Sequence, residues 1–225
     1  MEESYVVKTE RAIEIIKILQ KATQAMVKTA SMQIVEKYGR DPYLILISCL
    51  LSLRTKDLVS FPASCRLFEH AKTPQQMLKV PLNQIEKSIY PVGFYRNKAK
   101  TIHVISHTLI NRFGAKVPHT QSELMSLPGV GPKTANLVLG VAFKIPALCV
   151  DTHVHRIANR LGLVKTQTPE QTEAALQQVV PKEYWVELGQ LLVIWGQNIC
   201  VPISPKCSEC AIFHLCPRIG VTRHR

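Results

Sequence analysis

The sequence predicts an all-α protein, and two features of its pattern carry that prediction. Apolar residues recur at spacings of three and four almost throughout, as at Ile13, Ile16 and Leu19, which is the period of an amphipathic helix. Short joints marked by glycine or proline separate these segments, as they do in compact helical domains. Helices are expected near residues 9–22, 27–39, 42–53, 57–69, 74–79, 83–90, 96–112, 121–126, 132–143, 151–161, 169–179 and 183–198.

Proline and capping residues mark several of these boundaries. Thr168 precedes Pro169, and Gln171 follows three residues after the threonine. This spacing is typical of a capping box with proline at the first helical position. Pro62 conflicts with a continuous helix over residues 57–69, so a kink or a late start is expected there.

The longest apolar run is too short to cross a membrane. It reads YLILISCLLSL from Tyr43 to Leu53, about half of the roughly 20 residues that a spanning helix needs. We therefore expect a buried helix and no membrane segment. The amino terminus, MEESYVVKTER, has early acidic residues and no apolar core, unlike a secretory signal or a transit peptide. A cytoplasmic protein is expected.

The chain is strongly basic. Lys and Arg outnumber Asp and Glu by 28 to 16 in 225 residues, and the formal net charge is +12. Such an excess favours a polyanionic partner, either nucleic acid or an anionic membrane. Charge alone does not choose between the two.

Four of the seven cysteines crowd the C-terminal tail, namely Cys200, Cys207, Cys210 and Cys216. Their spacing, C-x6-C-x2-C-x5-C, indicates a shared metal centre. Zinc and a [4Fe-4S] cluster both accept four cysteines, but structural zinc sites more often show two close Cys pairs, and only one is present. The spacing alone mildly favours the cluster.

A glycine-rich turn opens the stretch LPGVGPKTANLVLGVAF from Leu127 to Phe143. Gly129 and Gly131 flank Val130 between two expected helices, which permits positive φ angles and close backbone approach. Such a turn, with the helix start that follows it, can bind a phosphate through its N–H groups. A plain helix-to-helix turn explains the glycines equally well. The net charge favours phosphate binding.

Lys133 lies in the first turn of the helix that follows. The positive end of the helix macrodipole disfavours an ammonium group there, and this favours a neutral amine if burial and nearby positive charge assist it. A neutral amine is a nucleophile that forms a Schiff base with an electrophilic carbon. For a lysine taken alone, a solvated side chain or a simple phosphate contact is the more common case.

Asp151 opens the next helix, in CVDTHVHRIANRLGL. Aspartate is among the best N-caps, and capping alone explains its presence. A carboxylate close to a reactive lysine also accepts a proton or stabilises positive charge on a sugar ring. Both roles are open from the residue itself.

Taken together, LPGVGPKTANLVL, VDTHVHRIANRLGL and the cysteine tail resemble the endonuclease III family of helix-hairpin-helix (HhH-GPD) DNA glycosylases, from about Ala30 to Pro217. The resemblance implies a bifunctional glycosylase and AP lyase of base excision repair that removes oxidised pyrimidines and cleaves the abasic strand by β-elimination. It implies that Lys133 attacks the anomeric carbon of a flipped-out nucleotide. Asp151 matches the family's catalytic aspartate and would face Lys133 across a DNA-binding cleft.

The resemblance also assigns residues that would contact DNA. The hairpin would bind the backbone through Leu127, Gly129, Val130 and Gly131. Phe94, in PVGFYRNKAK, matches an apolar wedge that enters the base stack; its alternative is a core residue at a helix start.

Arg54 departs from the family pattern. In LLSLRTKD it stands where the family usually carries glutamine. Arginine offers five donors, no acceptor and a fixed charge. We expect Arg54 to fill the gap left by the flipped base and to favour guanine O6 and N7 opposite it. A phosphate contact is the alternative of nearly equal weight.

The architecture that the resemblance implies has two helical domains. Residues 35–145 would form a central domain with the hairpin, and residues 1–34 with 146–225 a second domain that carries a [4Fe-4S] loop over 200–216. The four tail cysteines would hold the cluster. The expected partner is double-stranded DNA with damaged pyrimidines or abasic sites, bound by a monomeric, bacterial, nucleoid-associated protein.

Two other functions compete with this one. A monofunctional adenine or mismatch glycosylase shares the hairpin and the cluster, but Lys133 argues against it, as does the chain end soon after Cys216, which leaves no room for an adenine-specific domain. A non-catalytic helix-hairpin-helix DNA-binding protein would use the hairpin alone. The presence of both Lys133 and Asp151 disfavours it.

Overall fold

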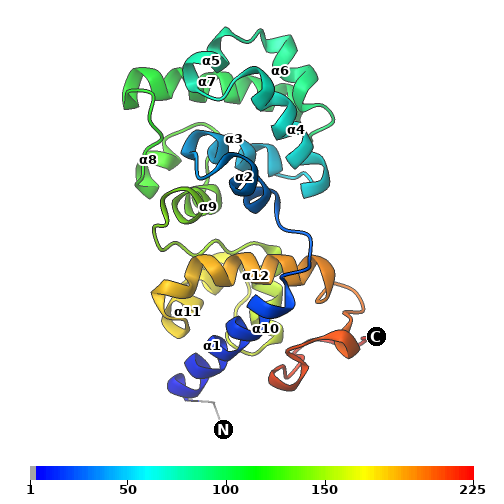
Figure 1. Ribbon diagram of the computed structural model, residues 1–225. Coiled ribbons are helices and arrows are strands. Elements are labelled where there is room, and N and C mark those ends of the chain that lie inside the picture. The colour runs from blue at the N-terminus through cyan, green and yellow to red at the C-terminus, as the bar shows by residue number, and fades with distance from the viewer. Residues whose placement is uncertain (1–3) are drawn as a thin grey trace. The chain divides into compact units, whose positions relative to one another are not determined.

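The computed structural model describes residues 4–225, which contain helices and no strand (Figure 1). This confirms the all-α prediction. The α-helices are α1 (Tyr5–Ala22), α2 (Ala30–Tyr38), α3 (Pro42–Ser52), α4 (Asp57–His70), α5 (Pro74–Lys79), α6 (Leu82–Ile89), α7 (Tyr95–Phe113), α8 (Gln121–Met125), α9 (Pro132–Phe143), α10 (Thr152–Arg160), α11 (Pro169–Val179) and α12 (Trp185–Asn198). Three short 3₁₀ turns are η1 (Lys182–Tyr184), η2 (Cys207–Glu209) and η3 (Phe213–Leu215).

The chain forms two compact units. One spans Thr29–Ile145, and the other joins the described residues before Thr29 to Pro146–Arg225. The sequence places the first boundary between residues 34 and 35, whereas in the structure it lies before α2. The reason is that Ala30 and Ile34 are buried and α2 packs against α3 and α4.

The central unit is built around α3. Every residue from Tyr43 to Leu51 is buried, and α3 packs against α2, α4, α7 and α9 (Figure 1). Asp41 starts the helix by accepting the Leu44 N–H at 3.0 Å. The longest apolar run is therefore a buried helix, as expected. No helix within residues 4–225 is long and apolar enough to cross a membrane.

Helix α4 continues on both sides of Pro62. It begins at Asp57, so the late start expected at this proline is wrong. Proline removes one hydrogen bond, the one to the carbonyl four residues earlier. That carbonyl belongs to Leu58, whose side chain is exposed, so the missing bond falls in a solvent-facing turn of the helix.

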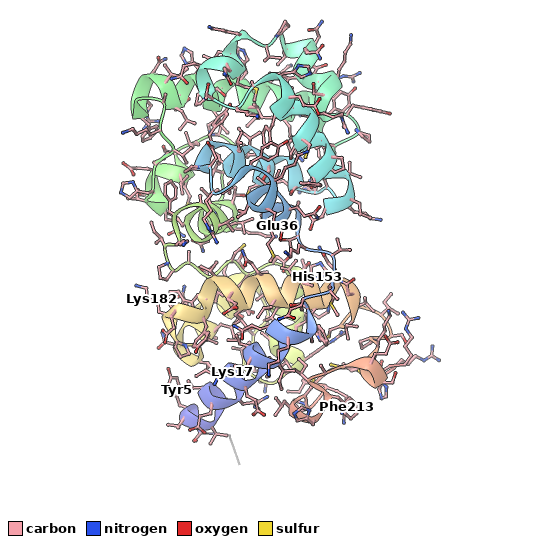
Figure 2. All side chains as sticks on the ribbon, viewed as in Figure 1. Tyr5, Lys17, Glu36, His153, Lys182 and Phe213 are labelled. Carbon is pink, nitrogen blue, oxygen red and sulfur yellow. The ribbon has the colours of Figure 1, made fainter. Side chains whose placement is uncertain are left out.

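The other unit buries the apolar face of α1 against α11 and α12. Ala12, Ile15, Ile16 and Leu19 form that face, while Tyr5 and Lys17 project away from it (Figure 2). Helix α12 also packs against α10. The cysteine tail follows α12, so its position is set by this core.

Candidate functional site

The glycine turn between α8 and α9 is exposed but anchored. Leu127 and Val130 are buried at 2% and 6% exposure, and the Val130 N–H donates to the Leu127 carbonyl at 3.2 Å. Gly129 adopts a positive φ of 77°, which favours glycine. Both of these side chains therefore point into the protein, and the backbone of the exposed glycines is left to meet a ligand.

Gly131 is the N-cap of α9, and Pro132 is its first residue. Glycine has no side chain with which to cap the amides of the first turn, and those amides have no acceptor within the helix. Gln121 ties the two helices together, because its amide donates to Asn136 Oδ1 at 2.8 Å. The turn thus presents backbone N–H groups at the positive end of α9, which is a site suited to phosphate.

Lys133 is the second residue of α9 and is exposed. The next residues, Thr134 and Ala135, are buried, so the lysine lies at the edge of the helix face that packs on α3. A solvated side chain is the more common case for such a lysine taken alone, and the side chain of Lys133 is exposed.

Asp151 caps α10. Its Oδ1 accepts the N–H of His153 at 2.8 Å and of Val154 at 2.9 Å, which is the geometry of a good N-cap. The capping role considered from the sequence is therefore real. It does not exclude a second role for the same carboxylate.

Two arginines of α10 bind the cysteine tail. The Arg156 guanidinium donates to the Cys200 carbonyl at 2.8 Å, and Arg160 donates to the Val201 carbonyl at 2.8 Å. Arg160 also donates to Cys200 Sγ at 3.4 Å. The helix that Asp151 begins is thereby attached to the first of the four tail cysteines.

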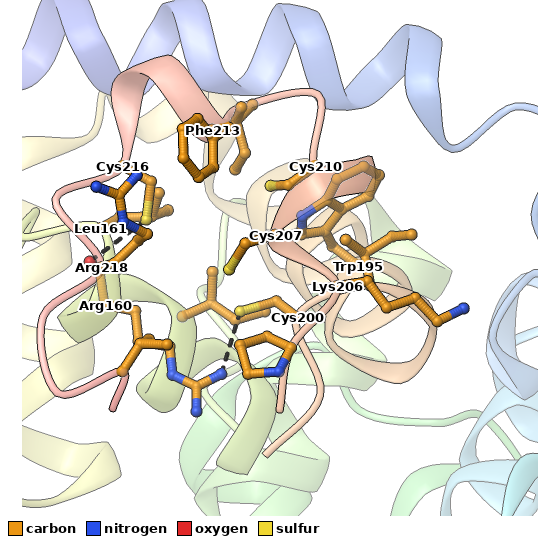
Figure 3. Close-up of a pocket in the computed structure, with 15 residues that line it drawn as sticks. Arg160, Leu161, Trp195, Cys200, Lys206, Cys207, Cys210, Phe213, Cys216 and Arg218 are labelled. Carbon is orange, nitrogen blue, oxygen red and sulfur yellow. Dashed lines mark hydrogen bonds between the residues drawn. The ribbon is translucent and has the colours of Figure 1, made fainter. Parts of the chain in front are cut away.

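The four tail cysteines line one pocket (Figure 3). Much of its wall is apolar, with Ile157, Leu161, Trp195, Ile199 and Ile212 among the lining residues. Within the described residues, no three Cys, His, Asp or Glu side chains converge closely enough to hold a single metal ion. The thiols therefore surround a space without closing on one point.

Burial raises the pKa of the Cys207, Cys210 and Cys216 thiols above its ordinary value. At Cys210, the backbone N–H of Ile212 opposes this rise in pKa because it favours the thiolate. In the chain alone these groups therefore favour the protonated form. A metal centre would have to displace their protons.

Arg54 and Phe94 lie together on the central unit, each in the left-handed backbone region. Their φ angles are 52° and 58°, and both side chains are exposed, Phe94 to 62%. The Arg54 guanidinium carbon lies 5.9 Å from the Phe94 ring centroid. The exposure of Phe94 excludes its alternative role as a core residue.

A polar clip, formed by Thr55, Gly93 and Lys98, holds these two segments together. Thr55 Oγ1 accepts the Gly93 N–H at 3.1 Å, and the Lys98 ammonium donates to the Leu53 carbonyl at 2.6 Å and to Thr55 Oγ1 at 3.3 Å. A Cβ atom on Gly93 would lie 3.0 Å from the Arg54 carbonyl oxygen, so a larger residue would press on the Arg54 backbone.

Sequence reasoning did not find the polar clip. Lys98 is half-buried among neutral acceptors, and this burial lowers its pKa to about 8. The only sequence signal was a glycine just before the helix that carries Phe94 at its N-cap.

Comparison with known proteins identifies close similarities. The family model described as HhH-GPD superfamily base excision DNA repair protein matches residues 47–182. Endonuclease III of Thermotoga maritima is 45% identical over 196 residues, which cover 85% of this chain and 92% of that protein.

Two solved structures share the fold. One is a non-covalent Endonuclease III–DNA complex, with a TM-score of 0.81 and 34% identity over 93% of this chain and 95% of that chain. The other is a trapped Endonuclease III–DNA covalent intermediate, with a TM-score of 0.80 and 34% identity over 93% of this chain and 96% of that chain.

Proposed function

Because the chain belongs to the endonuclease III family of the HhH-GPD superfamily of base excision DNA repair proteins, we propose that it is a DNA glycosylase and AP lyase acting on oxidised pyrimidines. The observation that carries this proposal is the exposed lysine, Lys133, at the start of α9, directly after a turn of backbone amides suited to phosphate. The likeness to a covalent Endonuclease III–DNA intermediate supports it.

The proposed reaction begins with the DNA backbone held by the hairpin amides, which leaves the Lys133 amine beside the sugar of an extruded nucleotide. The amine nitrogen bonds to C1′ as the bond from C1′ to the base breaks, and the base leaves with a proton. Ring opening then gives a Schiff base. Loss of a C2′ proton expels the 3′ phosphate, and water releases the lysine.

Asp151 has two parts in this proposal. Its carboxylate stabilises positive charge that develops at the sugar and accepts a proton from the lysine. The same group caps α10 through Oδ1, which fixes its position. One residue thereby joins a structural role to a chemical one.

Borohydride trapping on an abasic or thymine-glycol duplex tests the function as a whole. A covalent adduct supports the glycosylase and lyase. Base release without an adduct supports a monofunctional glycosylase instead. Binding with neither outcome supports a non-catalytic DNA-binding protein.

We propose that Arg54, beside Phe94, fills the gap that the flipped base leaves in the duplex. There it would contact the base opposite the lesion. We expect Arg54→Gln to lower the ratio of cleavage opposite guanine to cleavage opposite adenine by roughly fivefold or more, because a bidentate contact contributes about 1–3 kcal/mol of discrimination. Single-turnover rates on matched duplexes measure this ratio.

Arg96→Gln is the matched control, because Arg96 is also exposed and lies beside an aromatic ring, that of Tyr95, at 5.2 Å. It should leave the ratio unchanged. If Arg54→Gln weakens cleavage equally opposite both bases, Arg54 contacts only a phosphate and the reading role is wrong.

The cysteine pocket fits a [4Fe-4S] cluster, which we propose as the resident cofactor. Four thiols surround a largely apolar space and do not converge on one ion, whereas sulfurs on one tetrahedral zinc ion lie about 3.8 Å apart. When bound, the cluster would cross-link the tail to itself across residues 200–216, while Arg156 and Arg160 of α10 hold the start of this tail. Cys200, Cys207, Cys210 and Cys216 would hold it.

The protein is expected to purify brown, with absorption at about 400 nm and about four irons per chain. Cys207→Ser should lose most of the iron, since it removes one of four ligands. Cys65→Ser is the control, because Cys65 lies on α4, in the other unit, and should keep it. Stoichiometric zinc without iron would contradict the cluster.

A further inference from the structure

The two tryptophans of the chain lie on the same helix but differ in one respect. Trp185 begins α12, and its indole N–H donates to the Val180 carbonyl at 2.8 Å. Trp195 is ten residues further along α12 and is 1% exposed. Its indole N–H is buried and finds no acceptor within residues 4–225.

A buried N–H without an acceptor destabilises a protein, and native proteins seldom leave one. Phenylalanine would fill much of the same space without this penalty. Trp195 therefore points to an acceptor that the polypeptide alone does not supply. The groups that surround the indole nitrogen indicate which kind of acceptor this is.

The indole nitrogen faces the sulfurs of the cysteine pocket. Trp195 lines this pocket with all four tail cysteines, and its nitrogen edge is turned toward the side where Cys207 and Cys210 lie (Figure 3). From α10, Arg160 already donates to Cys200 Sγ at 3.4 Å. Two N–H groups from two helices therefore approach the sulfurs.

We propose that the Trp195 indole N–H donates a hydrogen bond to a sulfur of the iron–sulfur centre and raises its reduction potential. The inference rests on the proposed [4Fe-4S] cluster. Reduction adds negative charge to the cluster sulfurs, so a donor to them stabilises the reduced form more than the oxidised form. Trp195 is thus a tuning residue and takes no direct part in cleaving DNA.

Voltammetry of the iron-loaded protein tests this inference with a matched pair of variants. Trp195→Phe should shift the reduction potential to more negative values, and Trp185→Phe, which removes an N–H bonded to a backbone carbonyl, should leave it unchanged. Iron content is measured in parallel. Equal potentials in the wild type and Trp195→Phe at equal iron content would overturn the inference.

A second measurement needs no variant at the tuning position. In wild-type protein labelled with ¹⁵N-tryptophan, two indole N–H signals are expected, and Trp185→Phe assigns them. Loading with iron should move the Trp195 signal and leave the Trp185 signal in place.

The two failures can be told apart. Protein that binds zinc or no iron contradicts the cluster itself. Protein that binds iron, with an unmoved Trp195 signal, has a cluster to which this indole does not bond. The second result holds even where Trp195→Phe fails to fold.

Discussion

Replacing Lys133 with glutamine is expected to abolish borohydride trapping on an abasic duplex and to lower strand cleavage by on the order of 10³-fold or more. Glutamine keeps a polar side chain of moderate length but has no nucleophilic amine, so no Schiff base can form. The side chain is exposed, and its loss leaves the apolar face of α9 intact. The melting temperature should therefore remain close to that of the wild type.

Lys144→Gln is the control for this variant. Lys144 is also exposed and lies at the opposite end of the same helix, as the C-cap of α9. It should trap and cleave like the wild type. Retained trapping by Lys133→Gln would show that another amine forms the adduct, and the role proposed for Lys133 would be wrong.

Helix bounds could be predicted best where a proline begins the helix. The structure places α5, α9 and α11 at Pro74–Lys79, Pro132–Phe143 and Pro169–Val179, as the sequence indicates. Proline suits the first helical turn and is excluded from most later positions, so the start has one solution. Where a proline lies inside a helix, as Pro62 does in α4, the same preference favours a late start that the helix does not have.

The sequence predicts that the first helix starts near residue 9, but α1 starts earlier, at Tyr5. The helix begins at Tyr5, because Ser4 accepts the Val7 N–H with its side chain at 3.4 Å. The residues that follow, Tyr5, Val6 and Val7, are exposed, so the apolar period there does not follow a buried face. The Ser4 cap therefore extends the helix beyond the residues whose apolar side chains are buried.

The sequence indicates Arg54 and Phe94 as functional residues, but it does not predict the geometry that brings them together. Left-handed backbone at a non-glycine residue depends on local tertiary contacts, and both residues adopt it. The contacts come from Lys98 and Thr55, which meet Leu53 and Gly93. Pairing of residues so far apart in the chain leaves no local pattern in the sequence.

The cysteine pocket shows a similar limit. The spacing of the thiols indicates a metal centre, and the fold gathers them around one space. The contribution of Arg160 and Trp195 to that space depends on how α10 and α12 pack. Trp195 lies in an apolar helix, and its sequence position says nothing about its indole N–H.

Asp151→Asn is expected to lower base removal and strand cleavage by about 10²- to 10⁴-fold while leaving the fold unchanged. The asparagine side-chain oxygen can accept the same two N–H groups that Asp151 Oδ1 accepts at 2.8 and 2.9 Å, and Asn and Asp are nearly equal as N-caps. The substitution removes only the negative charge. Single-turnover rates and thermal melting measure the two consequences separately.

Asp151→Ala removes both the cap and the charge, and comparison of the variants divides the two roles. Loss of the cap should cost about 1 kcal/mol, which lowers the melting temperature by about 2–4 °C in a chain of this size. Asp41→Asn is the control, because Asp41 caps α3 in the same way through Leu44 at 3.0 Å and should keep full activity. If Asp151→Asn keeps full activity while Asp151→Ala loses activity and stability together, the carboxylate serves only as a cap. Cleavage lost in Asp151→Asn at unchanged melting temperature would instead assign the charge to the reaction, since the cap and the fold are then intact.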